Sequence, residues 1–182
     1  NLDIDNDFGE TGNDRVEIIG DNDSTNIFGT STTDLIDSGE GADQLTGGGG
    51  KDDFRFDAVT DSTASNGDLT NRDSIQDFNA GGDNAAGTMQ VDDQIVTDTA
   101  IANATGDLTV TDVTNATDET NLVTELGNAS TFAANEAEVF NITNGDFADR
   151  SFLVIDESGN GAVDGGADTI VEVTGFSGTF DT

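Results

Sequence analysis

A large apolar residue recurs every nine positions in the first third of this 182-residue chain. The four copies are Ile27, Ile36, Leu45 and Phe54. An aspartate precedes the last three by two positions, at Asp34, Asp43 and Asp52. A period of nine suits neither a helix nor a simple hairpin, but it is the period of the parallel repeat G-G-x-G-x-D-x-U-x, in which U is a large apolar residue. We therefore expect short strands, each burying one apolar residue, joined by glycine-rich turns.

The copies of this repeat differ in quality. Residues 47–54 match every specified position, with Gly47, Gly48, Gly50, Asp52 and Phe54. Residues 38–46 match at Gly39, Gly41, Asp43 and Leu45, with Ser38 replacing the first glycine. Residues 29–37 keep Gly29, Asp34 and Ile36, and residues 20–28 keep Gly20 and Ile27 with Thr25 at the aspartate position. A further copy has Gly9, Gly12, Asp14 and Val16, two residues out of phase. A flexible Gly/Asp linker has the same composition, but it has no reason to keep this spacing.

Composition limits the chemistry to oxygen ligands. Five basic and 38 acidic side chains give a net charge of −33, so compaction needs bound cations, and nucleic acid is not an expected partner. The chain has no Cys, His, Trp, Tyr or Pro, which excludes thiolate or imidazole zinc sites, disulfides and histidine general bases. Carboxylates, hydroxyls, amides and carbonyls are the ligands that calcium or magnesium prefers. We expect no enzyme activity, since only Phe could line a sugar-binding cleft between paired carboxylates.

These repeats resemble the RTX (repeats-in-toxin), or hemolysin-type, calcium-binding family, whose β-rolls follow enzymes, toxins and surface proteins exported by bacterial type I systems. The resemblance implies that two repeats form one coil, so that loops on the same side are eighteen residues apart. Asp34 and Asp52 would then face each other across a calcium ion, and Asp43 would face Thr25. It also implies several ions. The implied ligand loops carry Asp14, Gly29, Asp34, Gly39, Gly41, Asp43, Gly47, Gly48, Gly50 and Asp52.

Residues 58–99 are expected to cap the repeats of residues 1–57. The segment "DSIQDFNAGGD", residues 73–83, resembles the D-x-I-x-D-F-x-x-G-x-D sequence that closes RTX β-rolls, and "VDDQIV" follows it. Asp73, Asp77 and Asp83 could bind further calcium or could be solvated surface residues. Alternation of Ile75 and Phe78, then of Val91 and Ile95, indicates half-buried strands.

Residues 100–182 are expected to form a β-rich C-terminal domain. Strand patterns occur at residues 107–113, and residues 151–156 and 168–176 form a hairpin-like pair. The spacing of Leu122, Val123 and Leu126 favours a short helix ending at Gly127, and residues 133–139 could form a second helix or lead into a strand. The predicted fold class is all-β: a short parallel β-roll followed by a mainly antiparallel cap, with one or two short helices.

The loop between the paired strands is a second candidate calcium site. Its oxygen-bearing residues follow the spacing of an EF-hand loop through position 9. Positions 1, 3, 5, 7 and 9 are Asp156, Ser158, Asn160, the carbonyl of Ala162 and Asp164, and the carboxylate of Asp168 follows at position 13. Position 12 is Ala167 and strands flank the loop, so it is not an EF-hand. An ordinary hairpin turn uses the same residue types.

The predicted function is that of a calcium-binding C-terminal module of an exported bacterial protein. It would stay unfolded at low calcium, fold outside the cell, and so support type I secretion and stability. The expected partners are calcium ions and an upstream domain of the same polypeptide. An adhesive or surface-layer calcium-binding module, with a surface or adhesion partner, is the alternative, and flanking tandem domains would distinguish it. A third interpretation is that the acidic composition is a halophilic adaptation that only holds hydration, without specific ion binding. We expect an extracellular location and no membrane span, since no apolar run is long enough.

Overall fold

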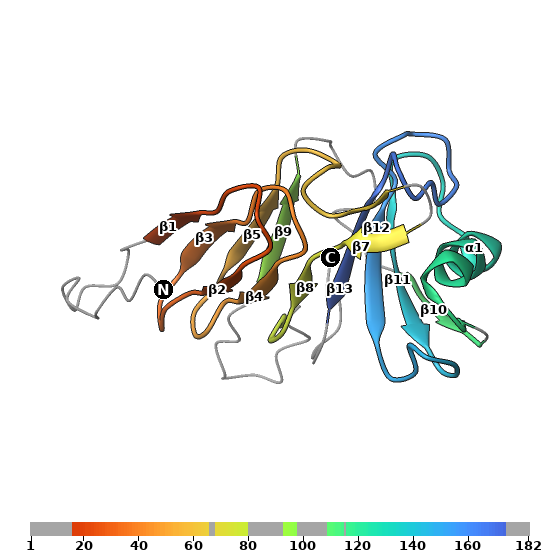
Figure 1. The fold of residues 1–182 in the computed structure, drawn as a ribbon, viewed down its shortest axis with the longest axis horizontal. Helices are drawn as coiled ribbons and strands as arrows, with labels where there is room; N and C mark the ends of the chain where they lie inside the picture. Colours follow the sequence, from red (N-terminus) through yellow and green to blue (C-terminus); the bar gives the residue numbers. More distant parts are fainter. Residues whose placement is uncertain (1–15, 66–67, 80–92, 98–108, 115, 174–182) are drawn as a thin grey trace, which may run out of the picture.

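The computed structural model describes residues 16–65, 68–79, 93–97, 109–114 and 116–173. This part of the chain is mostly β, with thirteen strands and one helix (Figure 1). The strands before residue 100 are β1 (Val16–Ile19), β2 (Asn26–Phe28), β3 (Asp34–Asp37), β4 (Gln44–Thr46), β5 (Asp53–Phe56), β6 (Thr63–Ser65), β7 (Asp68–Asn71), β8 (Ser74–Ile75) and β9 (Gln94–Thr97). The later elements are β10 (Thr109–Val113), α1 (Glu119–Ala129), β11 (Ala137–Ile142), β12 (Ser151–Ile155) and β13 (Thr169–Val173).

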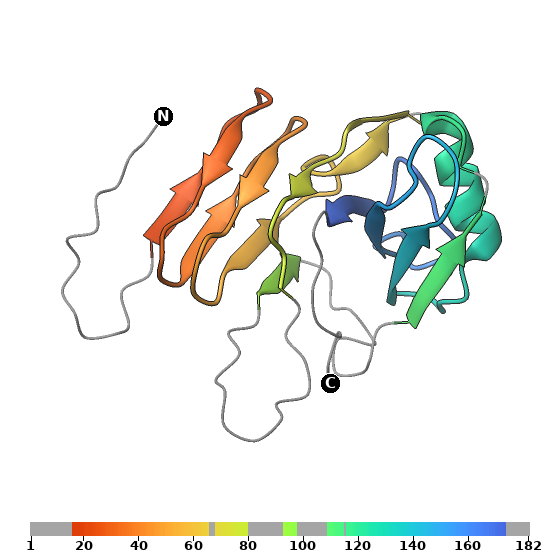
Figure 2. The same cartoon turned by 90° about the horizontal axis from the view of Figure 1, so that it is seen from below.

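The repeats form two parallel ladders with an eighteen-residue register. One sheet has the order β1-β3-β5-β9, and Ile18 pairs with Ile36, which pairs with Phe54. In the other ladder β2 pairs with β4, and Ile27 lies beside Leu45. Successive strands of the chain thus alternate between the two ladders, as Figure 2 shows from below. This spacing is the one that two nine-residue repeats per turn require.

The second ladder continues into the C-terminal region. The seven-stranded sheet has the order β10-β11-β12-β13-β8-β4-β2, so β8 joins the repeats to the rest of the molecule. Strands β11, β12 and β13 are antiparallel, as predicted for the hairpin-like pair. Strands β10 and β11 are parallel, as are β13 and β8, so the sheet is mixed rather than mainly antiparallel. The two short strands β6 and β7 pair antiparallel outside this sheet.

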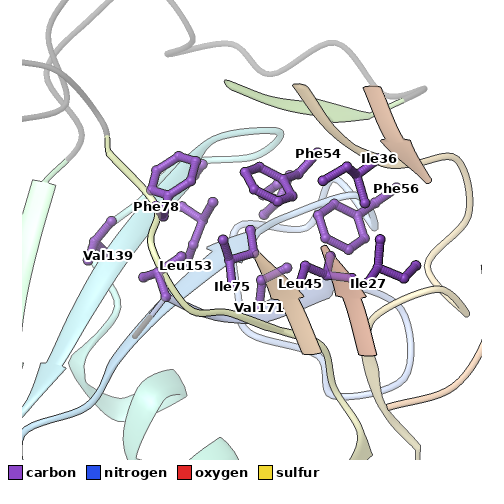
Figure 3. Close-up of a cluster of buried hydrophobic side chains, with 13 residues drawn as sticks. Ile27, Ile36, Leu45, Phe54, Phe56, Ile75, Phe78, Val139, Leu153 and Val171 are labelled. Carbon is purple, nitrogen blue, oxygen red and sulfur yellow. The ribbon is translucent and has the colours of Figure 1, made fainter. Parts of the chain in front are cut away.

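A first core lies between the two ladders (Figure 3). The four apolar residues of the nine-residue series, Ile27, Ile36, Leu45 and Phe54, are all buried in it. Ile75 and Phe78 extend it, and Ile95 packs against it. Ile75 in β8 and the partly buried Ile95 in β9 follow the predicted strand pattern, whereas Phe78 is buried outside any strand. Val91 lies outside the described residues.

A second core lies on the other face of the C-terminal sheet, beneath α1. Successive residues of a strand point to opposite faces, so Leu153 joins the first core and Phe152 the second. Helix α1 contributes Leu122 and Leu126. It begins at the N-cap Asp118, whose carboxylate accepts the amide N–H of Asn121, and it runs through Gly127 to Ala129. The predicted stop at Gly127 was wrong, because one glycine costs a helix interior only about 1 kcal/mol. Residues 137–142 form β11 rather than a second helix.

Among the described residues, no helix is both long enough and apolar enough to cross a membrane.

Candidate functional site

The aspartates of the repeats are buried at the entrance of each strand. Asp34, Asp43, Asp52 and Asp73 are at most 1% exposed. Each precedes its large apolar residue by two positions, so both side chains point to the same side of the strand, toward the interior. An aspartate two positions before each large apolar residue therefore places a carboxylate in the interior beside the apolar side chain.

The first column of these residues consists of Thr25, Asp43 and Asp73. Asp43 Oδ1 accepts the amide N–H of Thr25 at 2.7 Å and its hydroxyl at 3.0 Å. Asp73 Oδ1 in turn accepts the amide N–H of Asp43 at 2.8 Å, and Asp73 Oδ2 accepts the hydroxyl of Ser38 at 2.7 Å. Each carboxylate thus binds the main chain of the preceding turn.

The second column consists of Asp34, Asp52 and Asp93. Asp52 Oδ1 accepts the amide N–H of Asp34 at 2.9 Å, and Asp93 Oδ1 accepts that of Asp52 at 3.0 Å. Asp34 Oδ2 accepts the amide N–H of Thr30 within its own loop at 2.6 Å. Asp34 and Asp52 therefore lie at the starts of two paired parallel strands, β3 and β5, and an amide–carboxylate hydrogen bond joins them.

No described ion pair reaches the four buried aspartates of these columns. The basic side chains with described ion pairs lie elsewhere: Arg55 contacts Asp57, and both Arg72 and Arg150 contact Glu172. Burial raises the pKa of Asp52 to about 7, with the neighbouring Asp93, Asp34 and Asp77 adding to the rise against a hydrogen bond from Asp34 N–H.

The same effect is larger at Asp73, where burial raises the pKa to about 8 despite hydrogen bonds from Asp43 and Ser38. Burial also raises the pKa of Asp34 and of Asp43. Buried carboxylates without a cation favour the protonated form. When ionised, the columns carry negative charge that no described ion pair balances.

One carboxylate oxygen of the first column lacks a hydrogen-bond partner. Asp43 Oδ2 is buried and has no hydrogen-bond partner. A buried carboxylate oxygen without a partner is unfavourable in an isolated protein, and a hard cation is one group that satisfies it. Among the described residues no three acidic side chains gather as a carboxylate cage for a metal ion. A cation at Asp43 would therefore depend on main-chain carbonyls as well, which calcium accepts as ligands.

The glycines leave room for these carboxylates and for close packing of adjacent loops. A Cβ atom added to Gly47 would lie 2.4 Å from Asp52 Oδ2, and one added to Gly29 would lie 2.7 Å from Asp34 Oδ2. Gly48 has φ +97°, and a Cβ there would lie 2.0 Å from the carbonyl oxygen of Thr30 in the preceding turn. Only glycine fits such a position. The carboxylate and main-chain carbonyl oxygens that crowd together here are the type of ligand that calcium binds.

Other predicted ligands have different surroundings. Asp77 accepts the amide N–H groups of Gly47 and Gly48, both at 2.9 Å, so its carboxylate fastens the last repeat loop. Gly39, Gly41 and Gly50 adopt positive φ in the repeat loops. Asp14 and Asp83 lie outside the described residues.

The loop of residues 156–168 is closed by its own hydrogen bonds. Asp156 accepts the amide N–H groups of Gly159 at 2.7 Å and Gly161 at 2.8 Å, as well as the hydroxyl of Ser158 at 2.9 Å. Burial raises its pKa, but these hydrogen bonds outweigh burial and the net pKa is lowered.

The remaining predicted ligands of this loop bind one another. Asp168 accepts the amide N–H of Asp164 at 2.6 Å and that of Ser158 at 3.1 Å. The side chain of Asn160 accepts the amide N–H of Ala162 at 2.8 Å and donates to Asp164 at 2.5 Å. These contacts are those of a hairpin loop closed by its own hydrogen bonds, and calcium binding by this loop stays a prediction.

Sequence reasoning missed Asp93 as a member of a column. It lies 41 positions after Asp52, and Asp73 lies 30 positions after Asp43, so neither keeps the nine-residue phase. The signal that could have found Asp93 is the local D-x-U triplet, since Ile95 follows it by two residues as Ile75 follows Asp73. A search for that triplet without fixed spacing identifies both.

The chain matches no protein-family model and no curated protein.

Proposed function

We propose that the chain is a calcium-binding module in which the repeat loops hold cations between adjacent turns. The observation that carries this proposal is the burial of four aspartates, with Asp43 Oδ2 lacking any partner and no described basic side chain paired with them. Supporting it are the eighteen-residue parallel register and the nine-residue sequence period. On this proposal the two ladders are a short β-roll of the RTX type.

The net charge of −33 supports cation binding over a neutral structural role. Bringing this charge into a compact fold is opposed by self-repulsion, and buried carboxylates add a desolvation penalty. Protonation relieves that penalty at acidic pH. At neutral pH a bound cation relieves it by replacing the protons on the carboxyls whose pKa is raised to about 7 and about 8.

The residues proposed to hold calcium are the aspartates of the columns together with main-chain carbonyls of the repeat loops. Bound calcium would supply positive charge and a multidentate link between loops of successive turns. The chain's own contribution is to place Asp43 and Asp52 beside the preceding turn, where they already accept amide N–H groups. Gly47 and Gly48 have no side chain to separate adjacent loops, so the loops lie close enough to share ligands.

Folding coupled to calcium would then connect the site to location. Outside the cell calcium reaches the millimolar range that extracellular calcium modules, with dissociation constants of about 10⁻⁴ to 10⁻³ M, require. We propose that the module is exported by a type I system while unfolded and folds outside, attached to an upstream domain.

Circular dichroism with and without calcium at fixed ionic strength tests the proposal. We expect a largely disordered spectrum in chelator at neutral pH and a β-rich spectrum after calcium is added. Equal recovery of the spectrum with magnesium or sodium would reject calcium specificity and favour halophilic acidity instead.

A further inference from the structure

The turn between β11 and β12 contains an exposed Asn-Gly pair, Asn144 and Gly145. The main-chain N–H of Gly145 donates a hydrogen bond to Oδ1 of Asn144 at 2.8 Å. The side-chain amide of Asn144 is therefore folded back over the peptide nitrogen that follows it. We propose that Asn144 is a site of spontaneous deamidation, a slow self-modification that needs only water.

The chemistry requires the two groups that this turn holds together. The main-chain nitrogen of Gly145 attacks Cγ of Asn144, a C–N bond forms, and the side-chain nitrogen leaves as ammonia after taking up the proton that the peptide nitrogen loses. The product is a five-membered cyclic imide. Water then adds to one of its two carbonyls and opens the ring to aspartate or to isoaspartate. Glycine favours the step because it has no Cβ to hinder the approach.

A second Asn-Gly pair among the described residues provides an internal comparison. Asn160 is also exposed and precedes Gly161, but each of the two reacting groups is hydrogen-bonded to another residue. The N–H of Gly161 donates to Asp156 Oδ2 at 2.8 Å, and the side-chain oxygen of Asn160 accepts the N–H of Ala162 at 2.8 Å. Ring closure at Asn160 must first break these bonds, so exposure alone does not decide reactivity.

The product at Asn144 would disturb the turn that formed it. Gly145 forms a bridge with Ala116, and a Cβ at Gly145 would lie 2.0 Å from the carbonyl oxygen of Ala116, so the two main chains touch. Asp146 N–H donates to the same carbonyl at 3.0 Å. Isoaspartate inserts an extra main-chain carbon at residue 144, and either product adds a negative charge beside Asp146. We expect the bridge to Ala116 to loosen as the protein ages.

Peptide mapping by mass spectrometry tests this inference on the full chain aged in mildly alkaline buffer. Calcium is included, and circular dichroism verifies that the sample remains β-rich. We expect Asn144 to convert at least about tenfold faster than Asn160, because hydrogen bonds that must open raise the barrier at Asn160. In urea the two rates should become similar. Asn144→Gln should abolish conversion at position 144 and leave that at Asn160 unchanged.

Similar rates at the two sites in the folded protein would overturn the inference. So would faster conversion at Asn160, or no conversion at Asn144 over a period in which the urea-unfolded chain converts. Because the measured quantity is a ratio within one folded sample, it does not depend on whether the repeat loops bind calcium.

Discussion

Asp43 and Leu45 illustrate at the residue scale how one repeat serves two purposes. Both side chains point inward from the same strand entrance, and the leucine fills the core while the carboxylate meets the preceding turn. The sequence alone predicts the positions of both, because strand alternation couples them. It does not predict that Asp43 Oδ2 lacks a partner, because that depends on the neighbouring turn.

Replacing Asp43 by Asn tests the role of this buried charge. The change keeps size and an acceptor for Thr25 but removes the charge, so the ion-free protein should be at least as stable as the wild type. The calcium concentration at the folding midpoint should rise by roughly tenfold, equivalent to about 1.4 kcal/mol, since affinity follows ligand charge. Calcium titration followed by circular dichroism measures the shift.

Asp23→Asn is the matched control, because Asp23 is an exposed aspartate of the same repeats. It should leave the calcium midpoint nearly unchanged. The same shift in both variants would show that only overall charge matters. Asp61, which lies outside the repeat phase, is unsuitable as a control because it is buried and accepts the N–H of Ala58.

The stability of the ion-free protein should fall as pH rises from 5 to 8. The pKa values of Asp52 and Asp73 are raised in the folded state from 3.8 to about 7 and about 8. The folded state therefore binds more protons than the unfolded state, and the stabilisation from these groups, complete below pH 4, is lost as pH passes through 7 and 8. Circular dichroism in chelator at several pH values measures the trend, because the β-rich folded fraction should fall as the pH rises.

Asp73→Asn should flatten that pH dependence, because its amide stays neutral throughout. Stability that instead rises from pH 5 to pH 8 in chelator would contradict the assignment of these carboxylates as buried without a cation.

At the scale of elements, the nine-residue period predicts strands β2 to β5 because each contains one U position. It fails for β8 and β9, which continue the ladders after longer connections and keep only the D-x-U triplet. The parallel pairing of β10 with β11 was also beyond the sequence, since a strand pattern does not specify its neighbour. Local patterns indicate which residues form strands, and tertiary packing decides the order.

Adjacent glycines in the best repeat loop should respond oppositely to alanine. Gly48 has φ +97° and lies against the carbonyl of Thr30, whereas a Cβ at Gly49 would make only ordinary contacts, 3.6 Å from Ser31. Gly48→Ala should lower the free energy of unfolding by more than about 1 kcal/mol, and Gly49→Ala should leave it unchanged or raise it by up to about 1 kcal/mol. Urea denaturation in calcium measures both. Equal effects would show that the loops do not pack as described.

At the scale of the whole molecule, the repeats and the C-terminal region share one sheet. The boundaries predicted near residues 57 and 99 divide the sequence by texture, but β8 pairs with β4 on one side and β13 on the other. The first core likewise includes Leu45 of the repeats and Leu153 of the C-terminal sheet. We therefore expect the repeats and the C-terminal sheet to unfold together in a single transition.

Ile75→Ala should reveal this coupling, because Ile75 is fully buried at the junction. It should lower the free energy of unfolding by about 2 to 5 kcal/mol while leaving a single transition. Scanning calorimetry in calcium, comparing calorimetric and van't Hoff enthalpies, measures it. Two separate transitions in the wild type would show that the repeats and the C-terminal sheet are independent.

A crystal structure of the protein grown in calcium is the most direct test of the central claim that the repeat loops bind cations. We expect ion density between adjacent loops, at about 2.3 to 2.6 Å from carboxylate and main-chain carbonyl oxygens, with Asp43 Oδ2 among the ligands. Calcium-grown crystals with no ion at the repeat loops, and with Asp43 Oδ2 still lacking a partner, would contradict it.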